Sequence, residues 1–327
     1  MKILVRLPNW LGDMVMSMGF IQALYQAYPE SSISVIVKNG LEDLLDYFPP
    51  LHYRYLFSKE EYPGVRGALR FGRAIAQNEK YDLFFSLPDS FSAALMGFAT
   101  GAKKRIGYKH DGRSFLLNFT TPRDKSQHRV EQYITLLEAF VGAKMEKQQI
   151  KLRGVQRSAG EPILVNLNSE AVSRRMPVEK AVSLMKELRL STNAKVIMIG
   201  GKNDISFVDE VMGRIPDTAN IEVMTGKTTI PSLVRQMSDA SLLLTTDSGP
   251  AHLANACGLP TIVLFGAGNE KNTAPYNKDN CEVIRLGELA CEPCEKNVCA
   301  IYGIPECLRL LDEKRIVKSV MSLASIR

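Results

Sequence analysis

Four short polar segments each follow a run of aliphatic residues, and the first of them is residues 8–13. It follows the apolar run 3–5 and opens a helical pattern. Gly12 allows a close backbone approach, and Asp13 lies where the N–H groups of a helix start keep a carboxylate ionised. Such a carboxylate can serve as general base for a hydroxyl, a role worth roughly 10²–10⁴-fold in rate. The plainer interpretations are that Asp13 caps its helix and that Trp10, the only Trp, belongs to the core.

The second segment is the Asn-Leu-Asn-Ser turn that ends at Ser169, followed by two arginines before a helix. Arg174 and Arg175 beside a helix N-terminus, with Ser and Asn close by, supply charge and fixed donors for a diphosphate. A leaving group bound in this way needs no metal ion. The alternative is a solvated basic turn in which Ser173 caps the helix and Pro177 occupies its first turn.

The third segment is the Gly-Gly-Lys-Asn-Asp turn at residues 200–204. Its glycines let the backbone approach a ligand, and Asp204 could accept hydrogen bonds from ribose hydroxyls. The turn matches neither the dinucleotide-binding GxGxxG pattern nor the P-loop. A helix N-cap at Asp204 explains the segment equally well.

The fourth segment, residues 245–252, separates a Leu-rich run from an Ala-rich helical pattern. Its small residues bring backbone N–H groups towards a ligand, and Asp247 or Ser248 can bond sugar hydroxyls. Gly249 opens the helix, and His252 lies one turn further on. A lone helical histidine is more often a packing residue, so both roles remain open for His252.

Short aliphatic runs alternate with helical periodicity along almost the whole chain, as in parallel sheets covered by helices. The ligands of such sheets bind beyond the carboxyl ends of the strands, where these four segments lie. The Gly- and Pro-containing stretch 154–162 is the best linker, which predicts domains at 1–153 and 154–327. The last helix, from 312 to about 326, could pack on the second domain or return to the first. The expected elements are strands at 3–5, 33–37, 83–85, 163–165, 195–199, 242–245 and 261–264, and helices at 13–28, 65–78, 130–141, 177–188, 205–214, 230–237 and 249–257.

The bulk composition is that of an ordinary globular protein, with 327 residues, 45% hydrophobic and 23% charged residues and a net charge of +6. Two domains fit this length. We expect a cytoplasmic protein, because no apolar run is long enough to cross a membrane and residues 1–13 are interrupted too early for a signal peptide. The positive charge suits a phosphate-bearing ligand or the anionic inner-membrane surface. Aromatic residues do not alternate with the basic ones, which argues against nucleic acid.

The four segments together resemble glycosyltransferase family 9, the ADP-heptose:lipopolysaccharide heptosyltransferases. The resemblance rests on Leu-Gly-Asp near the start, Ser-Arg-Arg-Met-Pro in mid-chain, and Thr-Asp-Ser-Gly-Pro-Ala-His-Leu-Ala followed by Leu-Pro-Thr-Ile-Val-Leu-Phe-Gly at 259–266. It implies a GT-B fold, in which two Rossmann-like doubly wound domains face each other across a cleft. It also implies metal-independent, inverting transfer from an ADP-sugar to a lipid-linked saccharide.

The resemblance also assigns roles to individual residues. It makes Asp13 the base, with Asn9 and Gly12 in the acceptor-binding half. Arg174 and Arg175 correspond to residues that meet the donor phosphates. The remaining donor-binding positions that it implies are Ser169, Asp204 at the ribose, Lys227 and Thr228 along the adenine, and Asp247, Ser248 and Gly249 with His252 beside them.

Two departures from the family pattern lie close to the expected donor site. Asn-Leu-Asn at 166–168 replaces the usual Pro-Gly-Ala, and Met176 stands where Trp is common. Glycosyl transfer remains the expectation, while heptose as the sugar is left open. The Asn-Trp-Leu-Gly-Asp opening favours the second heptosyltransferase over the first.

Four of the six cysteines, Cys291, Cys294, Cys299 and Cys307, fall within 17 residues as C-x2-C-x4-C-x7-C. Four thiolates at this spacing could hold Zn²⁺ in a closed structural site that plays no part in catalysis. Reduced thiols or disulfides that brace a loop are the alternative.

Three other functions compete with glycosyl transfer. A nucleotide-sugar 2-epimerase shares the architecture, and would convert a donor without any acceptor. A non-catalytic nucleotide-sugar-binding protein would have no need to keep Asp13. A purely peripheral membrane role would show salt-sensitive binding to anionic vesicles without turnover.

Overall fold

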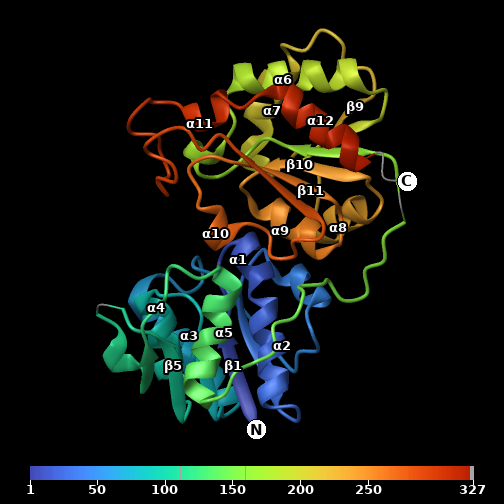
Figure 1. Cartoon of the computed structure of the whole chain (residues 1–327). Coiled ribbons are helices and arrows are strands. Elements are labelled where there is room, and N and C mark those ends of the chain that lie inside the picture. Colours follow the sequence, from blue (N-terminus) through green and yellow to red (C-terminus); the bar gives the residue numbers. More distant parts are fainter. Residues whose placement is uncertain (111, 159, 325–327) are drawn as a thin grey trace. The chain divides into compact units, whose positions relative to one another are not determined.

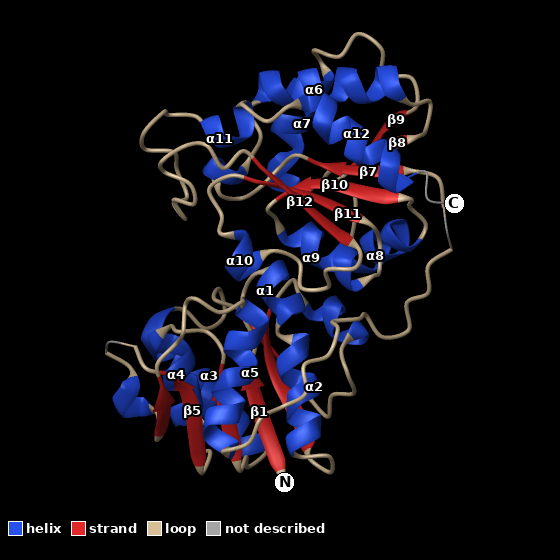
Figure 2. Ribbon diagram, viewed as in Figure 1, coloured by secondary structure: helices blue, strands red, loops and turns tan. Residues whose placement is uncertain are grey.

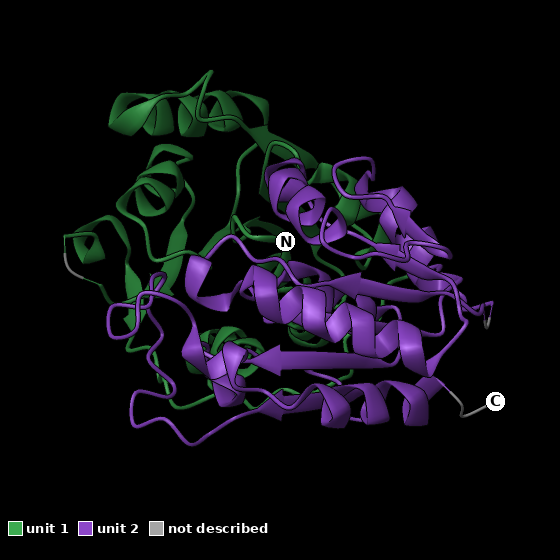
Figure 3. Ribbon diagram, turned by 90° about the horizontal axis from the view of Figure 1, so that it is seen from above, with its two compact units in different colours: residues 1–153 green, residues 154–327 purple. Residues whose placement is uncertain are grey.

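The computed structural model describes residues 1–110, 112–158 and 160–324. The chain divides into two compact units, Met1–Arg153 and Gly154–Arg327, which Figure 3 draws in green and purple. Each unit contains one six-stranded sheet in which every pair of neighbouring strands is parallel. In the described part of the chain, no helix combines the length and the apolar character that crossing a bilayer requires.

The sheet of the first unit has the strand order β3-β2-β1-β4-β5-β6, and Figure 1 labels β1 and β5 among these strands. The central strand β1 pairs with β2 on one side and β4 on the other, so that Ile3 lies opposite both Ile33 and Leu83. Aliphatic side chains on these strands are buried on both faces, as a sheet covered by helices requires. The strands are β1 (Lys2–Arg6), β2 (Ser32–Lys38), β3 (Arg54–Phe57), β4 (Leu83–Ser86), β5 (Lys104–Tyr108) and β6 (Phe119–Thr121).

Two pairs of helices cover this sheet, α2 with α5 and α3 with α4 (Figure 2). The helix expected over 13–28 is divided at Ser17, whose hydroxyl donates to the carbonyl of Met14 over 2.7 Å. Such a bond from a serine to the preceding turn competes with the helical pattern and bends a helix. The helices are α1 (Leu11–Met16), α2 (Met18–Ala27), α3 (Gly64–Asn78), α4 (Phe91–Ala99) and α5 (Arg129–Val141).

The sheet of the second unit repeats this arrangement in the order β12-β11-β10-β7-β8-β9. The order reverses between β7 and β10, and ligands of open parallel sheets bind at such a reversal. The strands are β7 (Ile163–Asn166), β8 (Val196–Met198), β9 (Ile221–Val223), β10 (Leu242–Thr246), β11 (Thr261–Phe265) and β12 (Cys281–Arg285). The helices are α6 (Val178–Ser191), α7 (Ile205–Met212), α8 (Ile230–Ser238), α9 (Gly249–Ala256), α10 (Glu270–Thr273), α11 (Glu306–Arg309) and α12 (Glu313–Ala324).

The last helix, α12, belongs to the second unit. It packs against α6 and β10, and Ile316, Val317 and Val320 are part of that unit's hydrophobic core. Burial of this apolar face stabilises α12 where it lies. Of the two alternatives, the structure shows the one in which the helix packs on the second unit.

Candidate active site

Asp247 and Arg174 form an ion pair at the carboxyl edge of the second sheet. Asp247 directly follows β10 and is only 4% exposed. The Arg174 Nη1 atom lies 3.3 Å from its Oδ2 atom. Burying a carboxylate is costly unless a charge or hydrogen bonds compensate it, and the guanidinium supplies that charge. Arg174 remains partly exposed, so the same group can also meet an anion in solution.

Gly268 makes the room that the Asp247 carboxylate needs. A Cβ atom at position 268 would lie 2.0 Å from Oδ2 of Asp247, closer than any real contact. Its backbone is fixed in turn, because the carbonyl of Gly268 accepts from Arg285, which also lies 2.8 Å from Glu270. Gly268 follows β11 outside every motif that the sequence singled out, and only this contact reveals its role.

A network of buried amides and hydroxyls joins the turns that follow β7 and β10. Asn166 donates through Nδ2 to the Ser248 hydroxyl over 2.9 Å and to that of Thr245 over 3.1 Å. Asn168 donates to Oδ1 of Asn166 over 3.1 Å, and the Thr246 hydroxyl donates to the Asn168 carbonyl over 2.7 Å. These hydrogen bonds hold the members of the network in one arrangement, and among the atoms of the network Oδ1 of Asn168 is buried without a hydrogen-bond partner. Asn166 and Asn168, which depart from the family pattern, thus join the two turns through hydrogen bonds that the sequence did not reveal.

Arg175 points to a different set of partners from Arg174. Its Nη2 atom donates to the carbonyl of Ser169 over 3.0 Å and lies 3.6 Å from Oδ1 of Asp204. The other carboxylate oxygen of Asp204 accepts from the backbone N–H of Gly201 over 2.8 Å. Asp204 therefore closes its own turn. It is also the N-cap residue of α7, as the capping alternative predicts, but its side chain makes no capping bond to that helix. The Ser169 hydroxyl donates to the carbonyl of Asp247 over 3.3 Å, which links the two arginine sites.

Ser173 connects the arginine turn to the cysteine-rich loop. Its N–H donates to the carbonyl of Asn297 over 3.1 Å, and its hydroxyl donates to that of Lys296 over 2.5 Å. The N-cap of α6 is Pro177, so the interpretation that Ser173 caps this helix is wrong. The same loop donates from the N–H of Glu295 to the carbonyl of Ala267 over 2.8 Å. It therefore braces the turns on both sides of Asp247.

The four clustered cysteines line one small cavity of about 20 Å³. All four are free thiols, and burial raises the pKa of Cys307 to about 11. Across residues 1–110, 112–158 and 160–324, no three His, Cys, Asp or Glu side chains are placed as a metal site requires. The structural zinc therefore stays a prediction, with Cys291, Cys294, Cys299 and Cys307 as its ligands.

The remaining residues that the sequence assigned to the donor lie in three different settings. The Lys227 ammonium donates to the carbonyl of Val223 over 2.8 Å, within its own loop, beside a half-buried Thr228. Gly249 is the first residue of α9, and His252 on the same helix is buried. For His252, this burial favours the packing interpretation.

Asp13 lies in the first turn of α1, just beyond the carboxyl end of β1. The N-cap of this helix is Trp10, whose side chain makes no capping bond, so the interpretation of Asp13 as the cap is wrong. The Asp13 carboxylate is partly exposed, and its Oδ1 atom lies 4.0 Å from Nε of Arg129. Burial and then the charge of Asp13 raise the pKa of Tyr133. Trp10 is 54% exposed with the Lys38 ammonium over its ring, so it is not a core residue.

A buried arginine holds the turn before α1 through hydrogen bonds. Arg6 donates to the side chain of Asn9 and to the carbonyls of Leu7 and Ile36. Burial lowers the pKa of Arg6 to about 10. Asn9 and the buried Gly12 are therefore held in a rigid turn, and Asn9 is already engaged on its carbonyl side.

A second carboxylate, Asp89, follows the neighbouring strand β4. Arg123 lies 2.8 Å from it and stacks over the ring of Tyr108 at 4.2 Å. Arg113, which is fully buried, donates to the carbonyls of Pro88 and Ser90 on either side of Asp89. Sequence reasoning missed this cluster, because only the order of the strands brings β4, β5 and β6 together.

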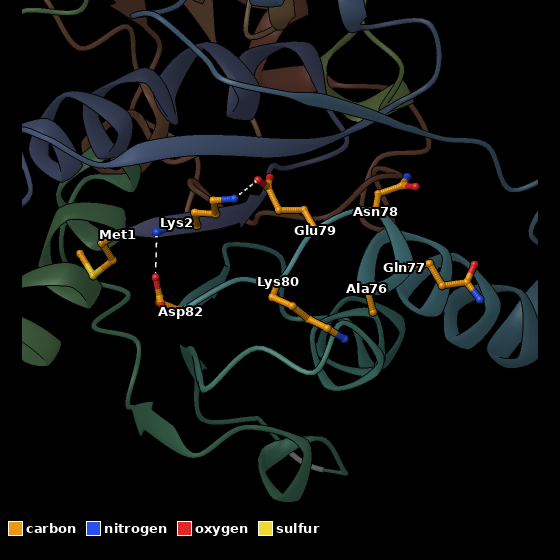
Figure 4. Close-up of a pocket in the computed structure, with 8 residues that line it drawn as sticks. All are labelled: Met1, Lys2, Ala76, Gln77, Asn78, Glu79, Lys80 and Asp82. Carbon is orange, nitrogen blue, oxygen red and sulfur yellow. Dashed lines mark hydrogen bonds and ion pairs between the residues drawn. The ribbon is translucent and has the colours of Figure 1, made fainter.

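A hollow of about 590 Å³ lies at the amino edge of the first sheet, opposite the edge that carries Asp13 (Figure 4). It surrounds the amino end of β1, whereas Asp13 follows the carboxyl end. Its charged groups already pair with one another: Lys2 lies 2.5 Å from Glu79, and the Lys2 N–H donates to Asp82 over 2.9 Å. This hollow is therefore not the candidate site.

Comparisons with known proteins bear on the family and on the fold of this chain. The glycosyltransferase family 9 (heptosyltransferase) profile matches residues 68–304. The lipopolysaccharide heptosyltransferase 2 of Salmonella typhimurium is 27% identical over 314 residues, which cover 88% of each chain. The structure of the Escherichia coli ADP-heptose lipopolysaccharide heptosyltransferase II aligns with a TM-score of 0.81 and 23% identity, over 99% of this chain and 98% of that one. The E. coli heptosyltransferase WaaC with ADP-2-deoxy-2-fluoro heptose aligns with a TM-score of 0.75 and 17% identity, over 98% and 99%.

These structural likenesses confirm the predicted GT-B fold class, since the two parallel sheets are those of the heptosyltransferase structures. The family profile covers well over half of the chain, and the sequence relatives cover most of it. The protein is a glycosyltransferase, and it belongs to glycosyltransferase family 9, the heptosyltransferase family.

Proposed function

We propose that the protein transfers a heptose from ADP-heptose to the inner core of lipopolysaccharide, as a heptosyltransferase 2 does. The observation that carries this proposal is the Arg174–Asp247 pair at the strand reversal of the second sheet, in a family 9 chain. Relatives named heptosyltransferase 2, and a neighbouring structure bound to an ADP-heptose analogue, support the donor and the acceptor.

On the donor side, Arg174 meets the diphosphate of ADP-heptose and balances the charge that develops as ADP leaves. A guanidinium can do this through fixed N–H donors, and its preorganisation by Asp247 lowers the cost of orienting it. Arg175, which contacts both the Ser169 carbonyl and Asp204, binds the ribose together with Asp204. The loop with Lys227 and Thr228 takes the adenine.

On the acceptor side, Asp13 removes the proton of the attacking hydroxyl. The oxygen of that hydroxyl forms a bond to the anomeric carbon of the heptose, while the bond from this carbon to the diphosphate breaks and ADP leaves. Attack from the face opposite the diphosphate inverts the anomeric centre. Arg129, 4.0 Å from Asp13, supplies a positive charge beside this carboxylate.

No metal ion takes part in this scheme, because the positive charge of Arg174 acts on the leaving group. Four thiolates would complete a tetrahedral zinc site and leave no position for substrate. A zinc ion at the cysteine-rich loop would accordingly be structural, and would brace the turns beside Arg174 and Asp247.

The test has a binding arm and a turnover arm. A ligand present at about 100 times its dissociation constant stabilises a protein by roughly 2.7 kcal/mol, so ADP-heptose should raise the melting temperature while UDP- and GDP-sugars should not. With a heptose-deficient inner-core acceptor, mass spectrometry should show the gain of one heptosyl group, and NMR an inverted anomeric configuration. Conversion of the donor without acceptor would instead identify an epimerase.

A further inference from the structure

The net positive charge of the protein lies entirely on its first unit. Residues 1–153 contain 21 Lys and Arg against 15 Asp and Glu, whereas residues 154–327 contain 20 of each. Within the first unit, the segment 103–129 holds eight Lys and Arg and only two Asp. The surplus therefore belongs to β5, β6 and the loops around them, and not to the diphosphate-binding unit.

Three phenylalanines are exposed beside this basic segment. Phe91 and Phe98 lie seven residues apart on α4, which places them on one side of a helix that has no charged residue. They are 39% and 50% exposed, and Phe115 in the loop after β5 is 75% exposed. The rings of Phe91 and Phe115 lie 6.3 Å apart between centroids. An exposed aromatic group of this size normally marks a binding surface.

Arg105 brings a cationic group into contact with the exposed rings. The Arg105 guanidinium lies 5.5 Å from the ring centre of Phe98 and donates to the carbonyl of Leu116, next to Phe115. Helix α3 packs beside α4 (Figure 1) and exposes three arginines without any acidic residue. We call this surface the α3–α4 face; its members are Arg66, Arg70, Arg73, Phe91, Phe98, Lys103, Lys104, Arg105, Lys109 and Phe115.

We propose that the α3–α4 face docks on an anionic lipid bilayer. The phenylalanine rings enter the interface between headgroups and acyl chains, and the Lys and Arg side chains reach the lipid phosphates. Charge complementarity favours this partner, because the basic groups surround the apolar ones as they do on membrane-surface helices. The proposal goes beyond sugar transfer, since it requires neither donor nor turnover.

Docking on this face would also place a lipid-linked acceptor close to the proposed base. Arg113 ties the loop of Phe115 to the turn that holds Asp89 and precedes Phe91. That turn follows β4, the direct neighbour of β1, and Asp13 follows β1 at the same edge. The end of the α3–α4 face that carries Phe91 and Phe115 would thus lie near the carboxyl edge of the first sheet, where the acceptor hydroxyl is activated. Lys103 and Lys104 lie at the other end of the face, at the start of β5.

The test is sedimentation of the full-length protein with vesicles. We expect binding to mixed phosphatidylglycerol–phosphatidylcholine vesicles, none to phosphatidylcholine alone, and release by high salt. The double variant F91S/F115S should lower the partition coefficient about ten-fold, as the loss of buried apolar groups requires. Lys104→Gln and Lys109→Gln should each lower it about five-fold at low salt.

The matched control is V298S/I301S in the neutral second unit, where both side chains are comparably exposed, at 60% and 66%. This variant should bind vesicles as the wild type does. Circular dichroism and melting temperature should be unchanged in all variants, because every altered side chain is exposed. The proposal would be overturned if the wild-type protein did not bind vesicles that contain phosphatidylglycerol. It would also be overturned if both double variants lost vesicle binding equally. Neither result depends on which sugar is transferred.

Discussion

The two units share one sheet topology but differ at the edge where ligands bind. At the carboxyl edge of the first sheet, Asp13 and Asp89 lie among arginines on a basic, aromatic surface. At that of the second, a buried network of amides and hydroxyls encloses Asp247 and leaves Arg174 partly exposed. The strand order therefore supplies the place for a site, and the residues of the turns decide its chemistry. The comparison implies that a substitution in the first unit can impair acceptor activation without changing donor binding, and that one in the second unit can impair donor binding.

The largest effect is expected from Asp13→Asn in the first unit. Transfer should fall by roughly 10²–10⁴-fold, because the amide cannot accept the proton of the acceptor hydroxyl. Single-turnover assays with ADP-heptose and acceptor measure this loss. The stabilisation of the protein by ADP-heptose should be unchanged, since Arg174 and the other proposed donor-binding residues lie in the second unit. Loss of donor binding would show that Asp13 has a structural role.

A smaller loss is expected from Arg174→Ala in the second unit. The rate of transfer should fall about 100-fold, because one preorganised donor to the leaving diphosphate is removed. ADP-heptose should also stabilise this variant less, in contrast to Asp13→Asn. Calorimetric titration with ADP-heptose provides the measurement.

The double variant R174A/D247N serves as the control for Arg174→Ala. It should recover folding stability relative to the single variant, because the carboxylate left buried without its arginine becomes neutral. It should not recover activity. Recovery of activity would mean that Arg174 acts only through Asp247.

Gly268→Ala should cause a loss of about ten-fold in donor affinity. The new Cβ atom would meet Oδ2 of Asp247 at 2.0 Å and displace the carboxylate from Arg174. A change of about 1.4 kcal/mol corresponds to this factor. Gly213→Ala is the matched control, since its Cβ would lie 3.3 Å from the nearest atom at the end of α7. Equal donor affinity in both variants would contradict the role of Gly268.

Periodicity was sufficient to predict parallel sheets covered by helices, because short aliphatic runs and amphipathic helices alternate along the chain. The GT-B fold class followed from the family resemblance. Most of the elements that it missed are short or polar, and the apolar helix α4 is the exception. Strand β5 begins with Lys-Arg, and β12 carries Glu and Arg at a half-buried position, so neither shows the apolar run of a central strand. Such elements gain their order from pairing with a neighbour already in place.

The site was predictable only where a turn carries its chemistry in consecutive residues. Asp247 and Arg174 were found in this way, and the structure joins them directly. Asn166 was noted as a member of the second segment and as a departure from the family pattern, but its bonds to Thr245 and Ser248 were not foreseen, and Gly268 was not noted at all. The contacts of both residues come from strands that are distant in sequence. Trp10 was misplaced because a side chain at the start of a helix can point either way, and spacing does not decide which.

The smallest expected effect is a difference in reaction rate among the cysteines, which thiol labelling measures. All six cysteines lie in the second unit, so labelling leaves the first unit unmodified. Burial raises the pKa of Cys307 to about 11, which leaves little thiolate near neutral pH, so Cys307 should react last of the four clustered cysteines. Peptide mass spectrometry after timed iodoacetamide treatment measures this order. A bound metal ion would instead protect all four thiols together until a chelator removes it, and that outcome would establish the structural zinc prediction in place of free thiols.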